Sequence, residues 1–180
     1  MPFPASFVRN GVRAGLRSTV CPVTPPAWTT IATGRSPGNH GIYDFVVVDD
    51  SVTDRISFRL ASGQDVLAEH VWSIAARQGI ASAAMNFPAT NFSRRFPGIM
   101  MPGFVTSRVL KMSVQPREFW QEVKDLPGFD VEDVSWDLDE GRIPLGDSLE
   151  LATFKEWIEY LKRKETGWFV AARHALKRHH

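Results

Sequence analysis

The 180-residue sequence has little of three things: cysteine, long apolar runs and net charge. Its single cysteine, Cys21, excludes an intrachain disulfide and a cysteine-rich metal site, and it predicts a reducing compartment. No apolar run reaches the roughly 20 residues that cross a bilayer, and the N-terminus has no apolar segment typical of a secretory signal. We therefore expect a soluble, cytoplasmic chain with no membrane partner.

Acidic and basic side chains are nearly balanced. The sequence has 21 Lys and Arg against 20 Asp and Glu, a formal net charge of +1. This balance predicts no nucleic-acid partner, because nucleic-acid binders carry a basic patch or stripe. We interpret one basic cluster as a solvated helix face rather than a binding patch: Lys162, Arg163, Lys164, Arg173, Lys177 and Arg178.

Strand-like and helix-like periods alternate along the chain, which is typical of the α/β class. The predicted strands cover 43–48, 55–60 and 80–87, with 55–60 half-exposed and 80–87 a buried parallel strand. A further strand is expected after a turn at Gly11. The stretch 65–78 is predicted to be a helix that begins at a Ser62/Asp65 capping box and ends at Gly79.

The segment from about 88 to 147 is rich in proline and glycine and is predicted to be an irregular insert with exposed aromatics such as Phe104. Two elements are expected inside it, a short helix after Pro116 and a strand near 131–134. The C-terminal part, about 149–178, is predicted to be helical, with a bend at Gly167. Its predicted apolar stripe consists of Phe154, Trp157, Ile158, Leu161, Trp168, Phe169, Ala172 and Leu176.

The stretch VTPPAWTTIATGRSPGNHGIYDF, from Val23 to Phe45, has the pattern of a helix start and a helix end. Thr24 stands where a helix N-cap belongs, and Pro25 occupies a first helical position, where its missing N–H does no harm. A short helix is expected over 27–33, with Gly34 at its end. Thr24 is therefore either a helix cap or a nucleophile.

This stretch resembles the nucleophile segment of the type I phosphodiesterase/nucleotide pyrophosphatase family, within the alkaline phosphatase superfamily. The matching residues are Thr24, Thr33-Gly34, Pro37 and His40-Gly41-Ile42, and 86–104 (NFPATN…GIMMPGF) is similar more weakly. The resemblance implies a three-layer α/β/α fold. It implies one partial alkaline-phosphatase-like domain over 1–180, with a nucleophile segment at 21–45. The first strand and the C-terminal metal-binding part are expected to be missing.

The resemblance also implies a chemistry. The family threonine that aligns with Thr24 attacks phosphorus and bridges two divalent ions, usually zinc, in the hydrolysis of phosphodiesters, nucleotides or related phosphate esters. A threonine hydroxyl must lose its proton to attack, and a divalent metal can promote that loss. The helix N-terminus adds a field that favours an anion. Because Pro25 and Pro26 lack N–H groups, backbone donors are expected only from Ala27 onward.

Two further residues allow two interpretations each. His40 is either a structural turn residue, which we favour, or a ligand. Asn86 ends a predicted parallel strand, where α/β proteins place their sites, and is either a substrate contact or part of the loop structure. Some relatives carry an asparagine three residues after the threonine, and this sequence has Ala27 there.

The metal ligands that the family places before the threonine and far beyond it have no counterpart in the pattern. The resemblance therefore predicts a chain that is inactive alone and leaves open whether it binds a metal through Thr24, although the complete centre would hold two ions. The alternative function is a non-catalytic binding or interaction module of the same family. An open sheet edge would favour its self-association.

Overall fold

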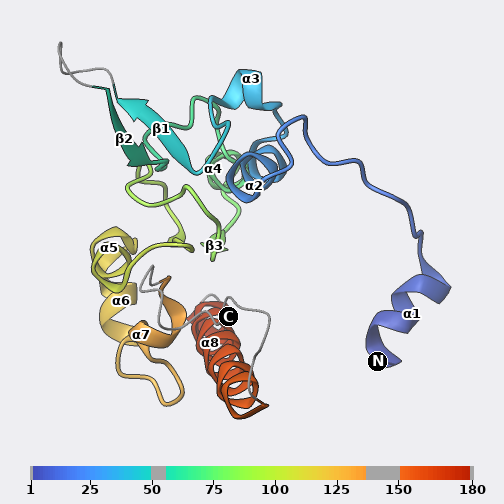
Figure 1. The fold of residues 1–180 in the computed structure, drawn as a ribbon, viewed down its shortest axis with the longest axis vertical. Helices are drawn as coiled ribbons and strands as arrows, with labels where there is room; N and C mark the ends of the chain where they lie inside the picture. Colours follow the sequence, from blue (N-terminus) through green and yellow to red (C-terminus); the bar gives the residue numbers. More distant parts are fainter. Residues whose placement is uncertain (1, 50–55, 137–150, 179–180) are drawn as a thin grey trace.

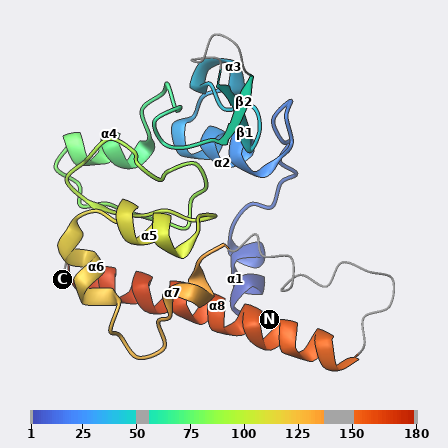
Figure 2. The same cartoon turned by 60° about the vertical axis from the view of Figure 1, so that its left-hand side comes forward.

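The computed structural model describes residues 2–49, 56–136 and 151–178. Figure 1 shows α2, α3 and the β1–β2 hairpin at one end of the molecule, α6, α7 and α8 at the other, and β3 between them. Figure 2 shows the same order from another side, with α8 running along one edge. The elements are α1 (Pro2–Asn10), α2 (Thr24–Thr33), α3 (Pro37–His40), β1 (Val46–Asp49), β2 (Ser57–Leu60), α4 (Val71–Arg77), β3 (Ala83–Met85), β4 (Ile99–Met101), α5 (Ser107–Ser113), α6 (Arg117–Val123), α7 (Val131–Val134) and α8 (Leu151–Arg178).

The described strands form two separate two-stranded sheets. The strands β1 and β2 pair antiparallel, from Val46 opposite Leu60 to Asp49 opposite Ser57. The strands β3 and β4 pair parallel, from Ala83 opposite Ile99 to Met85 opposite Met101. Helices and small sheets together confirm the α/β class, and the three-layer alkaline-phosphatase-like architecture stays a prediction. The strand expected over 80–87 is parallel, as predicted, but only three residues long.

The β1–β2 hairpin is more exposed than the sequence predicts. Every residue of β2 is exposed, although its alternation predicted one buried face. Phe58 is 70% exposed, and Val48 on β1 is 57% exposed. Alternation along a strand marks a face that something can cover. Among the described residues, nothing buries this face of the hairpin.

The β3–β4 sheet lies between two hydrophobic clusters. Successive side chains of a strand point to opposite faces, and accordingly Ile99 and Met101 belong to one cluster while Met100 belongs to the other. The C-terminal cluster comprises the buried residues Ile99, Met101, Leu110, Val114, Phe119, Trp120, Val123, Phe129, Val134, Trp168, Ala171 and Ala175. The α2–α4 cluster comprises the buried residues Ala32, Trp72, Ala84 and Met100.

The helix predicted over 65–78 begins only at Val71, so its predicted start was wrong. Ser62 and Asp65 do contact each other, because the Asp65 carboxylate accepts from the Ser62 backbone N–H at 2.8 Å. That carboxylate also binds Arg59 at 2.5 Å. The N–H of Leu67 donates to His40 O at 3.0 Å. These contacts hold the segment before α4 as a turn rather than a helix.

The segment after residue 88 is more regular than predicted. Its described part, up to residue 136, contains β4, α5, α6 and α7, so an irregular insert was wrong there; residues 137–150 lie outside the described residues. The helix expected after Pro116 is confirmed as α6. The strand expected at 131–134 is the short helix α7. The Asp130 side chain accepts from the Glu132 N–H at 2.9 Å, which is an N-cap contact that favours a helix start.

The C-terminal helical prediction is confirmed by α8, which runs unbroken through Gly167. At this glycine a Cβ would lie 2.5 Å from Val134 Cγ1, so its absence permits close packing against α7. The predicted stripe was partly wrong, because Phe154, Phe169 and Leu176 are exposed. The face that packs inward instead consists of Gly167, Trp168, Ala171 and Ala175.

The basic cluster on and near α8 does not form one uniform patch. Three of its members pair with acidic side chains: Lys162 with Glu159, Arg163 with Asp133, and Arg178 with Glu122. Lys164 is half-buried, and burial lowers the pKa of its ammonium group. The interpretation as a solvated helix face therefore holds for Lys162, Arg163 and Arg178, but not for Lys164.

The N-terminal part of the described chain lies apart from the body (Figure 1). After α1, residues 12–19 form no strand, so the strand expected there was wrong. Val12, Leu16 and Val20 are each at least 90% exposed. In the described residues no helix is long and apolar enough to cross a membrane.

Candidate functional site

Thr24 is the first residue of α2 and is half-buried. Val23 occupies the cap position with extended backbone and makes no side-chain cap bond. The N–H of Ala27 donates to Val23 O at 3.2 Å, which draws Thr24 into the first helical turn. Thr24 is therefore not the N-cap that the sequence pattern predicted, and this correction leaves its hydroxyl without a capping role.

The N-terminus of α2 presents fewer backbone donors than an ordinary helix. A helix normally leaves its first four N–H groups without partners inside the helix. In α2 the second and third positions are Pro25 and Pro26, which have no N–H, and the Ala27 N–H is already bonded to Val23 O. The expectation that donors begin at Ala27 was therefore wrong. The Thr24 N–H remains, and it has no acceptor among the described residues.

Aromatic and polar contacts fix α2 in place. Trp28 packs edge-on against Phe87, with ring centroids 5.4 Å apart, and Trp72 of α4 meets the same ring at 5.1 Å. At the other end Gly34 adopts a φ of 65°, and its N–H donates to Thr30 O at 2.8 Å. This left-handed ending suits glycine and confirms the predicted helix end.

His40 is fully buried at the end of α3, and both of its ring nitrogens are engaged. Nδ1 accepts from the Ile42 N–H at 3.1 Å, so in the neutral ring Nε2 carries the proton and donates to Thr30 Oγ1 at 3.0 Å. Burial lowers the pKa of His40 and favours this neutral form. A ring with both nitrogens engaged has no lone pair left for a metal, which matches the structural interpretation of this residue.

Asn86 follows β3 directly, at a φ of 59°. Its N–H donates to Met101 O at 2.9 Å and extends the β3–β4 pairing. A Cβ at Gly103 would lie 2.3 Å from Asn86 Oδ1, so the side chain packs tightly against that glycine. Among the described residues no hydrogen bond joins Asn86 to Thr24, and the role of Asn86 in substrate binding stays a prediction.

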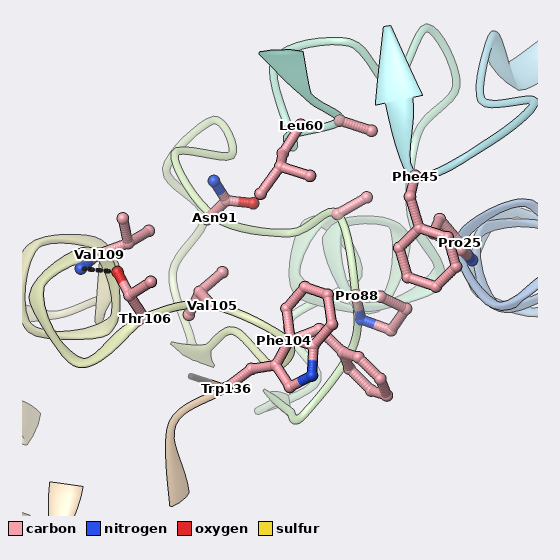
Figure 3. Close-up of a pocket in the computed structure, with 12 residues that line it drawn as sticks. Pro25, Phe45, Leu60, Pro88, Asn91, Phe104, Val105, Thr106, Val109 and Trp136 are labelled. Carbon is pink, nitrogen blue, oxygen red and sulfur yellow. Dashed lines mark hydrogen bonds between the residues drawn. The ribbon is translucent and has the colours of Figure 1, made fainter. Parts of the chain in front are cut away.

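A pocket of about 160 Å³ opens beside the start of α2 (Figure 3). Pro25, the neighbour of Thr24, forms part of its wall, as do Phe45 and Phe104. The Trp136 ring stacks on Phe45 at 6.3 Å between centroids and lies 6.2 Å from the Phe104 ring. The other lining residues are Leu60, Ala61, Pro88, Ala89, Asn91, Val105, Thr106 and Val109. The wall is mostly apolar, and none of the described residues that line it has an ionisable side chain.

Backbone strain is concentrated around this pocket. The described non-glycine residues with positive φ are Asn86, Ala89, Phe92 and Phe104, and all of them lie within 86–104. Ala89 and Phe104 line the pocket itself. Left-handed conformations of residues other than glycine carry strain of order 1 kcal/mol or more and cluster at functional sites. The strain therefore points to this pocket rather than to another part of the described surface.

The described residues do not assemble a metal centre at Thr24. Nowhere in 2–49, 56–136 and 151–178 do three His, Cys, Asp or Glu side chains form a group that could hold a metal ion. His40 is engaged on both nitrogens, and His70 stacks on Trp72 with centroids 4.4 Å apart. The Thr24 hydroxyl is thus the single predicted ligand that these residues supply, and they do not fit the two-ion cage.

Sequence reasoning found Thr24 and missed the pocket beside it. Phe45 was interpreted as a strand residue, yet it lies just before β1 and turns its ring to Trp136. No periodic pattern marks Trp136, which lies one residue before the undescribed stretch. Only Phe104 carried a usable signal, an aromatic residue in a glycine- and proline-rich loop after a strand.

A comparison with known proteins assigns the family. The family model for type I phosphodiesterase / nucleotide pyrophosphatase matches residues 1–172. No curated protein and no solved structure matches the chain. The match extends over the Thr24 segment, the pocket, the α2–α4 cluster and the C-terminal cluster up to Ala171. The chain therefore belongs to the type I phosphodiesterase / nucleotide pyrophosphatase family.

Proposed function

We propose that Thr24 is the nucleophile of a metal-dependent hydrolase of phosphodiesters, nucleotides or related phosphate esters. Membership of the family supports the reaction class. The observation that carries the residue assignment is the position of Thr24: the first residue of α2, with no capping role, next to the Pro25 wall of the aromatic pocket.

The pocket suggests which part of the substrate lies beside Thr24. Apolar pockets bind planar or apolar groups, and stacked aromatic side chains favour rings. A volume of about 160 Å³ suits a single ring system of an ester rather than a long chain. With the ring against Phe45, Phe104 and Trp136, the phosphate would extend toward Thr24. The proposed substrates are therefore phosphate esters that carry an aromatic or heterocyclic group.

In the proposed reaction the Thr24 oxygen forms a bond to phosphorus as the bond from phosphorus to the leaving-group oxygen breaks. The Thr24 proton passes to solvent water, and water supplies the proton that the leaving-group oxygen gains. Water then cleaves the phosphothreonine ester and restores the hydroxyl. Besides its own side chain, Thr24 contributes its backbone N–H, which has no acceptor among the described residues.

The family uses divalent metals, and we propose two of them, zinc in the first instance, for the complete centre. Among the described residues, the Thr24 hydroxyl is the one ligand proposed for them, and no cluster of His, Cys, Asp or Glu completes a metal site. We further propose that the 180-residue chain by itself turns over substrate no faster than about a thousandth of a complete centre, because losing metal activation removes several kcal/mol of transition-state stabilisation.

The first test is release of nitrophenol from bis(4-nitrophenyl) phosphate, with and without zinc or manganese. Thr24→Ala is compared with Thr33→Ala, which changes the same residue type at the opposite end of α2. We expect near-background rates from the chain and from both variants. Rapid metal-dependent turnover that Thr24→Ala abolishes would support the nucleophile and refute the claim of inactivity. Rapid turnover that survives Thr24→Ala would refute the nucleophile.

A second test examines Thr24 without turnover. Backbone amide shifts are followed by NMR while 4-nitrophenyl phosphonate is added in the presence of zinc. Pro25 and Pro26 give no amide signals, so we expect the perturbation to fall on Thr24 and to skip directly to Ala27. Shifts confined to other regions, with Thr24 unmoved, would contradict the proposed site.

The alternative function, a non-catalytic interaction module, is supported by one specific observation. The β1–β2 hairpin exposes Val46, Val48, Phe58 and Leu60, and exposed apolar strands favour association. Light scattering at micromolar concentration would reveal self-association through this hairpin, and Phe58→Lys should reverse it. A monomer whose particle size is the same in both forms would argue against this alternative.

A further inference from the structure

A second, larger cavity shares no lining residue with the aromatic pocket. It is a groove of about 750 Å³ between residues 63–77 on one side and 93–97 on the other. Its size lies within the range of small-molecule sites. Neither the proposed hydrolysis nor the family match assigns a role to it.

The two walls of the groove are fastened at one end. The Gly63 N–H donates to Asn91 O at 2.8 Å. A Cβ at Gly63 would lie 2.0 Å from Ser93 Oγ, so only glycine permits this close approach. Ser93 is fixed in turn, because its hydroxyl donates to Thr90 O at 2.6 Å and Gln115 Nε2 donates to its carbonyl at 3.1 Å. The groove is therefore preformed rather than dependent on a ligand to shape it.

The charge of the groove is positive. Arg77 is neutralised by Glu69, with guanidinium–carboxylate distances of 3.0 and 2.7 Å. On the opposite wall Arg94 and Arg95 are exposed, and neither forms an ion pair within the described part of the chain. Counting the described lining residues, these two guanidinium groups leave the groove with two positive charges. Arginine is the side chain that best matches phosphate and carboxylate oxygens, because its planar donors bind two of them at once.

The floor of the groove is aromatic and uncharged. The His70 ring stacks on Trp72 at an interplanar angle of 11°, and Phe96 is half-buried beside them. Burial lowers the pKa of His70 to about 4, so the ring is neutral at pH 7. Gln64 and Ser73 add uncharged polar groups along the wall. The groove thus combines a basic rim with a neutral floor that can accept a planar group.

We infer that this groove binds an organic phosphate of nucleotide size, with its phosphate on Arg94 and Arg95 and its planar group on the floor against the half-buried Phe96. A phosphomonoester carries nearly two negative charges at pH 7, which match the two guanidinium groups. The bounded volume favours such a ligand over an extended polymer. The site is separate from Thr24, so the inference stands whether or not the proposed hydrolysis is correct.

The test measures binding of AMP, inorganic phosphate and adenosine by calorimetry at low salt, with the full 180-residue chain. We expect AMP to bind most tightly, because it alone engages both the rim and the floor. The double variant Arg94→Gln/Arg95→Gln should weaken AMP binding at least tenfold. Arg35→Gln, which changes an exposed arginine outside the groove, should leave it unchanged. Circular dichroism confirms that each variant folds.

Amide shifts locate the ligand. AMP should move the signals of Gln64 and Ser73, and Thr24→Ala should leave both the shifts and the affinity intact. Equal AMP affinity in the double variant and the parent chain would overturn the inference, as would AMP shifts confined to Thr24. Binding of an acidic peptide such as oligo-glutamate with no binding of AMP would also overturn it, in favour of a protein partner. Failure of the Thr24 tests alone would leave the groove result standing.

Discussion

The two hydrophobic clusters on either side of β4 differ in extent. The C-terminal cluster gathers twelve buried residues from β4, α5, α6, α7 and α8, together with connecting segments, whereas the α2–α4 cluster contains four. Both clusters share one strand, on which Met101 faces the first and Met100 the second. Met100 and Met101 therefore allow a direct comparison of the two clusters, because they are neighbours of the same residue type and are both almost fully buried.

The smaller cluster lies on the side of the proposed chemistry. Thr24 starts a helix of this cluster, and Trp72 of this cluster forms part of the basic groove. Several exposed apolar side chains lie on the neighbouring β1–β2 hairpin. Regions with few buried apolar contacts open at lower free energy than the core. The large cluster thus provides the stable body, and the functional candidates lie on the less stable side.

The largest expected effect tests this difference at β4. Met101→Ala should lower the free energy of unfolding by about 4 kcal/mol and Met100→Ala by about 2 kcal/mol, both within the usual range of about 2–5 kcal/mol for buried methionine truncation. The larger loss follows from the denser surroundings of Met101, which can relax less around the cavity. Urea unfolding followed by tryptophan fluorescence measures both values.

Because the two methionines are neighbours, the pair controls for strand position and residue type. Unchanged m-values would show that each variant still unfolds as one unit. Equal losses would show that the two clusters are equally tight, and a larger loss from Met100→Ala would reverse the comparison.

The next largest expected effect is a pH dependence of folding stability, caused by His70 beside the α2–α4 cluster. Burial and the nearby His40 lower the pKa of His70 from 6.5 to about 4. Between these pH values the native chain binds fewer protons than the unfolded chain, so stability falls as pH falls. The His70 contribution is fully present above pH 6.5 and is lost by about pH 4, with a total change of about 3 kcal/mol. Protonation of His40 at Nδ1 would also break its bond from the Ile42 N–H.

Thermal or urea unfolding between pH 7 and 4 measures this slope. His70→Phe keeps an aromatic ring on Trp72 but removes the titrating group. It should therefore flatten the dependence of stability on pH between pH 7 and 4. The pKa of Asp65 is lowered to about 2, chiefly by Arg59, so its own contribution is lost only below about pH 4. A slope that His70→Phe does not change would assign the pH dependence to other groups.

Local patterns in the sequence predicted the elements that local chemistry decides. Gly34 and Gly79 end their helices as expected, Pro116 precedes α6, and 151–178 is one long helix. The parallel strand after α4 also forms, although it is short. In each case the residues that carry the signal are neighbours in the chain, so propensity and capping suffice.

The failures have a different cause, because distant contacts overrode the local pattern. Leu67 donates to His40 instead of entering a helix, and Asp65 binds Arg59. Residues 169 and 176 carry apolar side chains, yet the helix turns its glycine and alanine face inward, where α7 approaches closely. The pocket beside Thr24 joins Phe45, Phe104 and Trp136 across the fold. No periodic pattern in the sequence predicts such a contact between aromatic residues that are far apart in the chain.

The smallest effect compares helix starts on the two sides of β4. On the C-terminal side Asp130 caps α7 through the Glu132 N–H, and Asp130→Ala should lower stability by about 1 kcal/mol.

On the other side α2 begins at an uncapped Val23. Val23→Ser would ordinarily stabilise such a helix, since a cap oxygen accepts from the second or third helical N–H. Here those positions are Pro25 and Pro26, so we expect a change within about 0.5 kcal/mol of zero. Urea unfolding of both variants decides the comparison. A clear gain from Val23→Ser would mean that the new hydroxyl has found the Thr24 or Ala27 N–H, and that the helix start at Thr24 can rearrange.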